Sequence, residues 1–167
     1  MKIILAIIIS LFSIGVIAQG VYQQPTAFLN GVFNHQIPKA RMIWLTRARR
    51  LQISKILGHK PNRLRIRYWK RNQRTAWILD EVGKDKPITT GIVINKGRIE
   101  LMKVLIFRET RGWEVRYPFF TNQFKGNSLN NFSHIDGISG ATLSVRALKK
   151  LAKLSLYLHK QQQGKRF

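Results

Sequence analysis

Four strand-like segments follow one another between residues 63 and 108, and the short turns between them limit this part of the chain to an antiparallel sheet. In the first segment Leu64, Ile66 and Tyr68 alternate with arginines, which is the period-2 pattern of a strand buried on one face. The other three candidates lie at 75–82, 88–94 and 98–108. Asn95-Lys96-Gly97 is short enough to join the last two as a hairpin.

Helical periodicity flanks these strands. Residues 39–57 are expected to form a helix, because Trp44, Ala48 and Leu51 recur at spacings of four and three. Residues 142–159 predict a second helix, and its expected buried face comprises Ala147, Leu148, Leu151, Leu154 and Leu158. The sequence therefore predicts an α+β domain with an N-terminal helix, an antiparallel β-sheet and a C-terminal helix.

The first segment has the composition of an export signal. A lysine at position 2 precedes an apolar run over residues 3–17, and small residues follow at Val16 and Ala18. We predict that residues 1–18 are a signal peptide cleaved after Ala18 and that residues 19–167 form a single domain. The alternative is an uncleaved anchor, although a bilayer span needs about 20 apolar residues. Both readings place the folded part outside the cytoplasm.

Positive charge dominates the composition. The chain has 30 Lys and Arg against 7 Asp and Glu, a formal charge of +23, and thirteen of the basic residues lie in the acid-free stretch 39–74. Such a charge favours anionic partners, which include nucleic acid, lipid headgroups, acidic proteins and phosphate ligands. The chain has no cysteine and its four histidines are widely separated, so we expect neither disulfides nor a metal site.

One run of residues has the chemistry of a ligand site. Asp136-Gly137-Ile138-Ser139-Gly140-Ala141-Thr142 leads directly into the predicted C-terminal helix. Gly140 permits close approach to the backbone, and a helix N-terminus offers free N–H groups to a phosphate. Thr142 adds a hydroxyl at the same point. These features alone also fit a threonine that simply caps the helix.

This run resembles the flavinylation motif of the FMN-binding domain family, which includes the C subunit of the sodium-pumping NADH:quinone reductase and the G subunit of the Rnf complex. The resemblance implies FMN bound covalently through a phosphoester to Thr142, made by a dedicated flavin transferase from FAD with magnesium. Asp136, Ser139, Gly140 and Ala141 match the recognition sequence. Ser144 fits the hydroxyl residue often found two places later.

The resemblance extends over about residues 75–160. Glu109-Thr110-Arg111-Gly112 and Gln123-Phe124-Lys125-Gly126 fall where the family shows Glu-Thr-Pro-Gly-x-Gly and Gln-Phe-x-Gly. Thr110 and Gly112 are therefore expected flavin contacts. Arg111 replaces the proline and Glu114 the second glycine, so we expect a loop of different shape here.

The expected function is that of an electron carrier in the periplasm or at the inner membrane, with no substrate-converting centre of its own. Its partners would be the transferase and a membrane-bound reductase or periplasmic redox protein, with contact to an anionic membrane favoured by the charge. The basic groups expected near the flavin ring are Arg111, Lys125 and Arg146, and the aromatic ones are Trp113, Phe119, Phe120 and Phe124.

Three alternatives stay open at this point. The chain would instead be a basic module that binds anionic polymers or lipids, a small flavin reductase, or an assembly subunit that retains the motif without using it. The export signal disfavours an intracellular nucleic-acid role.

Overall fold

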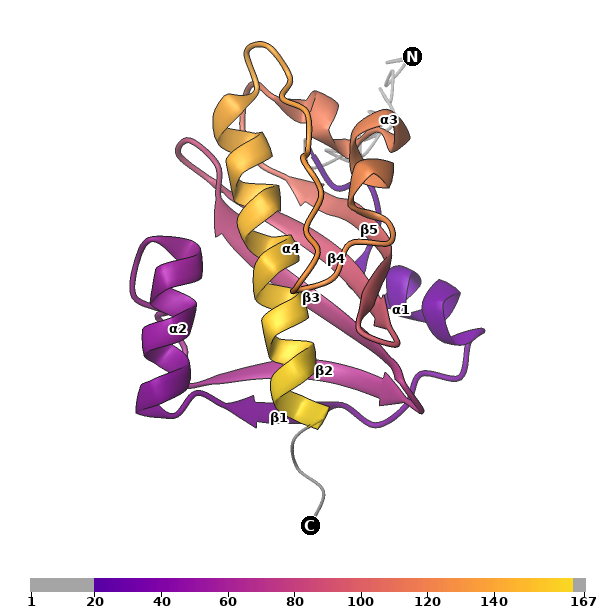
Figure 1. Cartoon of the computed structure of the whole chain (residues 1–167). Helices are drawn as coiled ribbons and strands as arrows, with labels where there is room; N and C mark the ends of the chain where they lie inside the picture. The colour runs from indigo at the N-terminus through magenta and orange to yellow at the C-terminus, as the bar shows by residue number, and fades with distance from the viewer. Residues whose placement is uncertain (1–19, 164–167) are drawn as a thin grey trace, which may run out of the picture.

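Five antiparallel strands form one sheet in which the spatial order follows the chain (Figure 1). The computed structural model describes residues 20–163, so the predicted signal peptide (1–18) lies outside the described residues. The strands are β1 (Arg41–Trp44), β2 (Arg65–Arg71), β3 (Arg74–Val82), β4 (Pro87–Asn95) and β5 (Arg98–Phe107). The helices are α1 (Pro25–Phe33), α2 (Arg47–Leu57), α3 (Pro118–Thr121) and α4 (Thr142–Gln163), with the short 3-10 turns η1 (Trp113–Arg116) and η2 (Asn122–Phe124) beside α3. The predicted α+β fold with its N-terminal helix, antiparallel sheet and C-terminal helix is confirmed.

Helices cover both faces of the sheet. On one face α4 and α2 enclose the larger core, in which Trp77 of β3 and Leu148 and Leu151 of α4 are fully buried. On the other face α1 buries Phe28 and Leu29, together with other side chains, against β3, β4 and β5. β4 is buried along nearly its whole length because it receives helices on both sides.

The β4–β5 hairpin is the tight turn that the sequence predicts. Lys96 and Gly97 are its two turn residues, and both have positive φ, +50° and +77°. This is the requirement of a type I′ turn, whose twist matches that of the strands it joins.

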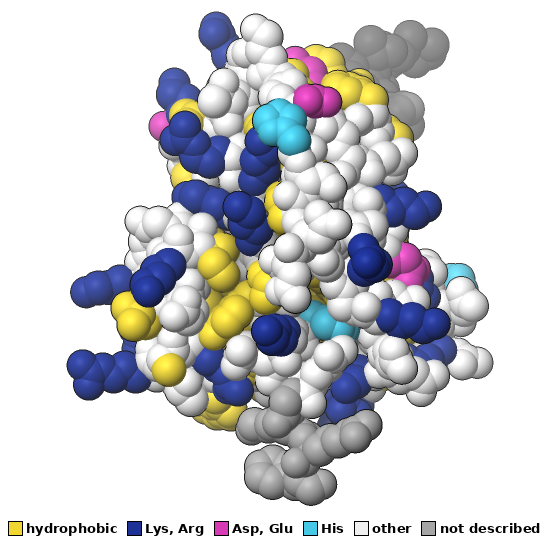
Figure 2. Space-filling view, viewed as in Figure 1, with side chains coloured by type: hydrophobic (Ala, Val, Ile, Leu, Met, Phe, Trp, Pro, Cys, Tyr) yellow, Lys and Arg dark blue, Asp and Glu magenta, His cyan; other side chains and the backbone are white. Residues whose placement is uncertain are grey.

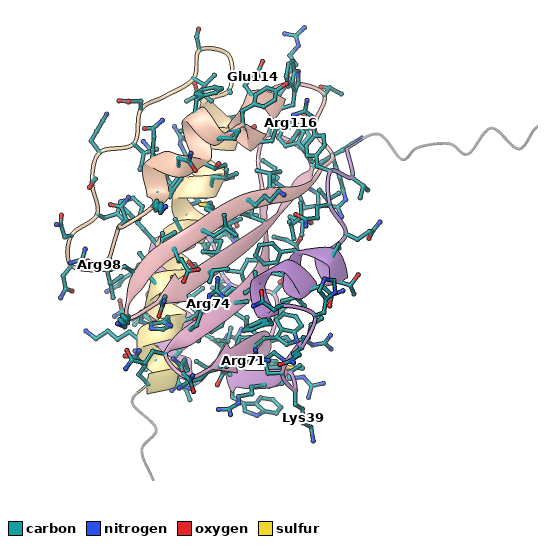
Figure 3. All side chains as sticks on the ribbon, turned by 90° about the vertical axis from the view of Figure 1, so that its right-hand side faces the viewer. Lys39, Arg71, Arg74, Arg98, Glu114 and Arg116 are labelled. Carbon is teal, nitrogen blue, oxygen red and sulfur yellow. The ribbon has the colours of Figure 1, made fainter. Side chains whose placement is uncertain are left out.

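Two arginines fix α1 to the sheet. Arg74 of β3 donates a hydrogen bond to the Val32 carbonyl (2.6 Å), and Arg71 at the end of β2 donates to the Phe33 carbonyl (3.5 Å). Figure 3 shows both side chains between α1 and the sheet. Cations beside the last carbonyls of a helix donate hydrogen bonds to oxygens that have no partner within the helix. Their positive charge also interacts favourably with the negative end of the helix dipole. α1 was not expected from the sequence.

The predicted helix over 39–57 is wrong in its first half. Residues 41–44 form β1, and α2 begins only at Arg47, with the Thr46 side chain accepting a hydrogen bond from the Arg49 N–H. The proposed apolar stripe is also wrong, because Trp44 and Leu51 are 57% and 59% exposed. Pairing with β2 takes residues 41–44 into the sheet, and α2 instead buries Ile53 and Leu57. Tertiary pairing has overridden a weak helical pattern.

Among residues 20–163, no helix combines the length and the apolar character that a membrane span requires.

Gly91 in β4 lies directly under the Phe28 ring of α1. A Cβ at this position would come within 2.6 Å of the ring, and the ring is enclosed in the core of that face. We therefore expect Gly91→Ala to lower the free energy of unfolding by about 1–3 kcal/mol, the usual cost of overpacking. The measurement is urea denaturation followed by circular dichroism.

Gly31→Ala is the matched control, because a Cβ there meets nothing within 4 Å. Gly31 lies inside α1, so this change should raise the free energy of unfolding by about 0.5–1 kcal/mol. Equal effects of the two substitutions would contradict the packing described.

His159 of α4 is a buried neutral imidazole. The Gln163 amide donates to its Nε2 (2.8 Å), so the ring proton is on Nδ1 and is donated to Thr75 Oγ1 (2.8 Å). Burial lowers the pKa of His159 from 6.5 to about 4, and the positive charge of Lys70 contributes to the same shift. Protonation therefore favours the unfolded chain.

Between pH 6.5 and about 4 the unfolded chain binds one more proton at this position than the folded chain. The free energy of unfolding should fall as the pH falls through this window, by up to roughly 3 kcal/mol. His159→Gln should remove this part of the pH dependence, whereas His35→Gln, at an exposed position, should retain it. Urea denaturation at several pH values gives the slope of the free energy of unfolding against pH. The same slope in His159→Gln as in wild type would refute the assignment.

Candidate functional site

The run from Asp136 to Thr142 is an exposed loop held by buried anchors. Ile135 before it and Ala141 within it are almost fully buried, and Ile138 packs against the core from a half-buried position. The side chains of Asp136 and Ser139 between these anchors are exposed. The loop is therefore fixed in place while its polar residues face solvent.

Thr142 is the first residue of α4, and its side chain is exposed. The first helical hydrogen bond runs from the Val145 N–H to the Ala141 carbonyl (2.9 Å). Ala141 therefore occupies the capping position, and Thr142 does not. The N–H groups of Thr142, Leu143 and Ser144 precede that bond, as the first N–H groups of any helix do. The hydroxyl of Thr142 thus lies beside backbone donors suited to a phosphate.

The glycines of the loop leave room above its backbone. Gly140 has a φ of +77°, which favours glycine over any residue with a side chain. A Cβ at Gly137 or at Gly140 would meet nothing within 4 Å. The space over this backbone is consequently open to a ligand.

The loop after β5 reaches the same place, as the family resemblance implies for Gly112. A Cβ on Gly112 would lie 2.6 Å from Ser144 Oγ and 3.4 Å from the Cα of Ala141, so this glycine packs directly against the first turn of α4. Its φ of +82° is again a glycine conformation. Thr110, two residues earlier, is exposed. The structure therefore brings Gly112 to the motif and places Thr110 on the surface of the loop that leads to it.

A hydrogen bond joins another predicted segment to the motif. The Asp136 N–H donates to Gln123 Oε1 at 2.8 Å. The next residue, Phe124, is fully buried and fixes the position of this glutamine. His134 lies 3.8 Å from the Asp136 carboxylate, and both side chains are exposed.

Glu109 fixes the start of the loop that carries Gly112. Its Oε1 accepts hydrogen bonds from three successive N–H groups, those of Lys84 (2.5 Å), Asp85 (2.8 Å) and Lys86 (2.9 Å). Burial opposes the charged carboxylate, but the three N–H donors and the Lys84 charge outweigh it and lower the pKa of Glu109. Glu109 is thus a structural anchor between the β3–β4 turn and the loop.

Exposed cations lie around the motif. Arg146 follows Thr142 by four residues, so the two side chains lie on the same side of α4. Arg111 and Lys125, on the two neighbouring segments, are also exposed. None of the three is paired with a carboxylate of the described residues. The field at the motif therefore favours an anion.

The structure divides the four aromatic candidates into two pairs. Phe120 and Phe124 are fully buried and stack edge to face at 5.5 Å, so they belong to the core. Trp113 and Phe119 are 41% and 62% exposed. Trp113 follows Gly112 directly in the chain, and its ring contacts Tyr117 and Arg116.

Sequence analysis missed one cluster near Trp113. The Arg116 guanidinium lies 5.2 Å from the Trp113 ring centre, 4.8 Å from that of Tyr117 and 4.2 Å from that of Tyr22. Figure 3 shows Arg116 among aromatic rings at this end of the molecule. Tyr22 is far from the others in the chain, so only the fold reveals the cluster.

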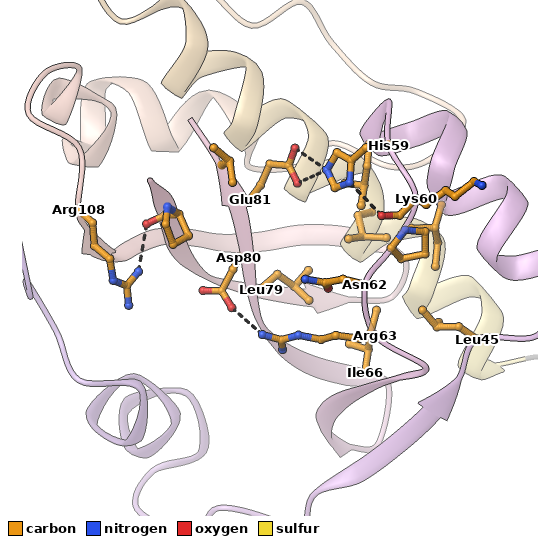
Figure 4. Close-up of a pocket in the computed structure, with 16 residues that line it drawn as sticks. Leu45, His59, Lys60, Asn62, Arg63, Ile66, Leu79, Asp80, Glu81 and Arg108 are labelled. Atoms are coloured by element: carbon orange, nitrogen blue, oxygen red, sulfur yellow. Dashed lines mark hydrogen bonds and ion pairs between the residues drawn. The ribbon is translucent and has the colours of Figure 1, made fainter. Parts of the chain in front are cut away.

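A cavity of about 580 Å³ lies elsewhere, between α2, the segment that follows it and the sheet (Figure 4). Its apolar lining includes Ile53, Leu79 and other core side chains. At its rim Arg63 pairs with Asp80 and His59 with Glu81 (3.3 and 3.0 Å). No motif residue lines this cavity, so it is not the site to which the motif points.

Within residues 20–163, no group of three or more His, Asp or Glu side chains is arranged to hold a metal ion.

Comparison with known families agrees with the geometry. The family model described as FMN-binding domain matches residues 83–156, a stretch that contains β4, β5, the loop with Gly112 and the motif with Thr142. No curated protein matches the chain. Residues 83–156 of this chain therefore match the FMN-binding domain family.

Proposed function

We propose that this protein is an exported flavoprotein in which FMN is joined by a phosphoester to Thr142, and that it carries electrons in the periplasm or at the inner membrane. The observation that carries the proposal is the exposed Thr142 hydroxyl in the first turn of α4, beside open glycines and free N–H groups. The family match supplies the cofactor class.

The residues at the motif fit an FMN phosphate. Its negative charge would lie at the positive end of the α4 dipole, within reach of the N–H groups of the first turn. Arg146, one turn further along the same side of the helix, adds a full positive charge. Gly140 allows the phosphate and ribityl chain to pass close to the backbone.

The covalent bond requires an enzyme that reaches Thr142, and the loop is built for such access. With FAD as donor, Thr142 Oγ1 displaces AMP from the FMN phosphorus and gives up its proton, so that a phosphoester replaces one pyrophosphate bond. The exposed side chains of Asp136 and Ser139 stand where a flavin transferase would recognise them. The hydrogen bond from Asp136 N–H to Gln123 holds this recognition sequence in a defined shape.

FMN, when bound, takes up and releases one or two electrons. The protein would anchor it, hold positive charge near it and supply Trp113 as a flat apolar surface for the flavin ring. We favour a carrier over an enzyme because the motif stands on an open surface and the cavity of about 580 Å³ contains none of its residues. The donor and acceptor would then be separate redox proteins, such as a membrane-bound reductase.

Replacement of the hydroxyl tests the attachment. Thr142→Val keeps the shape of the side chain at an exposed position, so we expect the folded protein to be retained within about 0.5 kcal/mol. The intact mass of wild-type protein, produced with a flavin transferase in the host, should exceed the chain mass by one FMN less one water. The variant should lack this increment.

Thr26→Val is the matched control, because Thr26 is an exposed threonine in the first turn of α1. It should keep the full increment. A flavin increment that survives in Thr142→Val would remove Thr142 from the proposal.

Trp113 offers a second test, which concerns the ring rather than the phosphate. An indole stacked on the flavin quenches its fluorescence, so Trp113→Leu should give a clear rise in emission per bound FMN relative to wild type. Phe119→Leu, at the other exposed aromatic position, should leave the emission unchanged. Equal emission from wild type and Trp113→Leu would show that the ring lies elsewhere.

A further inference from the structure

The sheet opens between β2 and β3. Their pairing stops at Tyr68 and Trp77, although β2 extends back to Arg65 and β3 continues to Val82. Beyond this point β2 pairs with β1 and β3 pairs with β4, and Figure 1 shows the two strands separating toward α2. Each strand is held by its other neighbour, so the opening is a fixed feature of the fold.

Ile66 and Leu79 show what the opening leaves between the strands. If the pairing of Tyr68 with Trp77 continued, these two residues would be register partners with their side chains in contact. Both instead line the cavity of about 580 Å³. Sites for small molecules have volumes of roughly 300–1,000 Å³, so the opening is large enough to hold a ligand.

The interior of this cavity is aliphatic. Its buried apolar side chains come from β1, α2, β3 and α4, and they are Leu45, Ile53, Leu57, Leu79 and Leu154. In Figure 2 hydrophobic side chains are visible in the seam between α2 and α4, with Lys and Arg side chains around them. An apolar ligand in the cavity would remove aliphatic surface from water, which is favourable.

The two carboxylates of the cavity already have cationic partners. Glu81 is almost fully buried, and it lies 3.0 Å from Lys150 and 3.0 Å from His59. Asp80 lies 3.3 Å from Arg63. A cationic ligand would have to displace one of these side chains before it could pair with a carboxylate.

The rim of the cavity has positive charge left over. Lys60 and Arg108 line it at exposed positions, and neither pairs with a carboxylate within residues 20–163. Arg63 donates one hydrogen bond to Asp80, whereas a guanidinium has five N–H donors. Figure 4 shows Asn62 and Arg63 extending from the loop before β2 toward β3. A ligand group at the rim would therefore meet N–H donors and excess positive charge.

We propose that this cavity binds a small apolar molecule that carries one anionic group. The apolar body would contact the aliphatic interior. The anionic group would stay at the rim, where it could accept charge-assisted hydrogen bonds from Arg63 and a further bond from the Asn62 amide. A ligand of this kind satisfies both parts of the cavity without breaking the ion pairs of Glu81.

This site is separate from the flavin site. All but three of its lining residues precede residue 83, where the family match begins, and the exceptions are Pro87, Arg108 and Leu154. Along α4, Leu154 is about 18 Å from Thr142, at 1.5 Å per residue. The two sites are therefore independent.

Two fluorescent probes with the same rings test the proposal. Anilinonaphthalene sulfonate carries an anionic group, and phenylnaphthylamine does not. The full chain is produced in a host without a flavin transferase, so that no flavin emission overlaps with that of the probe. The Kd of each probe is compared between wild type and variants, because other apolar parts of the chain contribute equally to all of them.

Arg63→Gln removes a cation from the rim. It should weaken binding of the sulfonate probe roughly tenfold and change that of the neutral probe by no more than about twofold. Arg67→Gln is the matched control, because Arg67 is an exposed arginine of β2 outside the cavity lining. It lowers the net charge equally and should keep the Kd of both probes within about twofold of wild type. An equal loss of the sulfonate probe in both variants would overturn the proposal.

Ile66→Trp fills part of the cavity. It should weaken binding of both probes roughly tenfold or more, because the indole takes the place of the probe rings. Met42→Trp adds the same side chain in β1 outside the cavity lining and should leave both Kd values unchanged. Circular dichroism establishes that the variants are folded, and Arg63→Gln, at an exposed position, provides the test if Ile66→Trp is not. A folded Ile66→Trp that binds both probes like wild type would contradict the proposed site.

Competition then identifies the body of the ligand. Decanoate has a flexible chain and naphthoate a flat ring, and each carries one carboxylate. Displacement of the sulfonate probe by either compound supports the proposal and shows which shape the cavity accepts. Displacement by neither would overturn it.

Discussion

The packing of α4 on the sheet positions everything else in this protein. Leu148 and Leu151 are fully buried against β-sheet side chains such as Trp77, and each buried leucine contributes roughly 1.5–3 kcal/mol. This contact sets where the helix begins, and hence where Thr142 presents its hydroxyl. The far end of the same helix meets α2 and β2, where Gln161 and Gln162 accept hydrogen bonds from Arg49 and Lys70.

A reactive side chain at a helix start is useful only if the preceding loop has a defined shape. Here two neighbouring segments supply that shape. Gly112 packs against Ser144 in the first turn, and Gln123 accepts a hydrogen bond from the Asp136 N–H. Both contacts use the backbone or the base of a side chain, so the outward surface of the loop stays open. The site thus combines a rigid base with an outward surface open to solvent, as the proposed attachment of FMN at Thr142 requires.

The sequence predicted the regular parts of the fold because β2 and α4 each bury one clear set of side chains, and because β3, β4 and β5 are apolar segments bounded by turn residues. It failed at residues 41–44, where the edge strand owes its form to pairing with β2 rather than to local preference. It also missed α1, a short helix held by packing and by Arg71 and Arg74.

The motif could be identified from the sequence because its residues are contiguous in the chain. The position of Gly112 beside the motif was expected only through the family resemblance. The cluster of Arg116 with Tyr22 depends on contacts between segments far apart in the chain, which no local pattern reveals.

The most direct test of the central claim is to locate the flavin on the chain by tandem mass spectrometry. Trypsin cleavage after Lys125 and Arg146 gives one peptide, residues 126–146, that contains Thr142 together with Ser139, Ser144 and other hydroxyl side chains. The account predicts that fragment ions carry the FMN phosphoester on Thr142 alone. An unmodified peptide from protein matured with an active flavin transferase, or a flavin on Ser139 or Ser144, would contradict it.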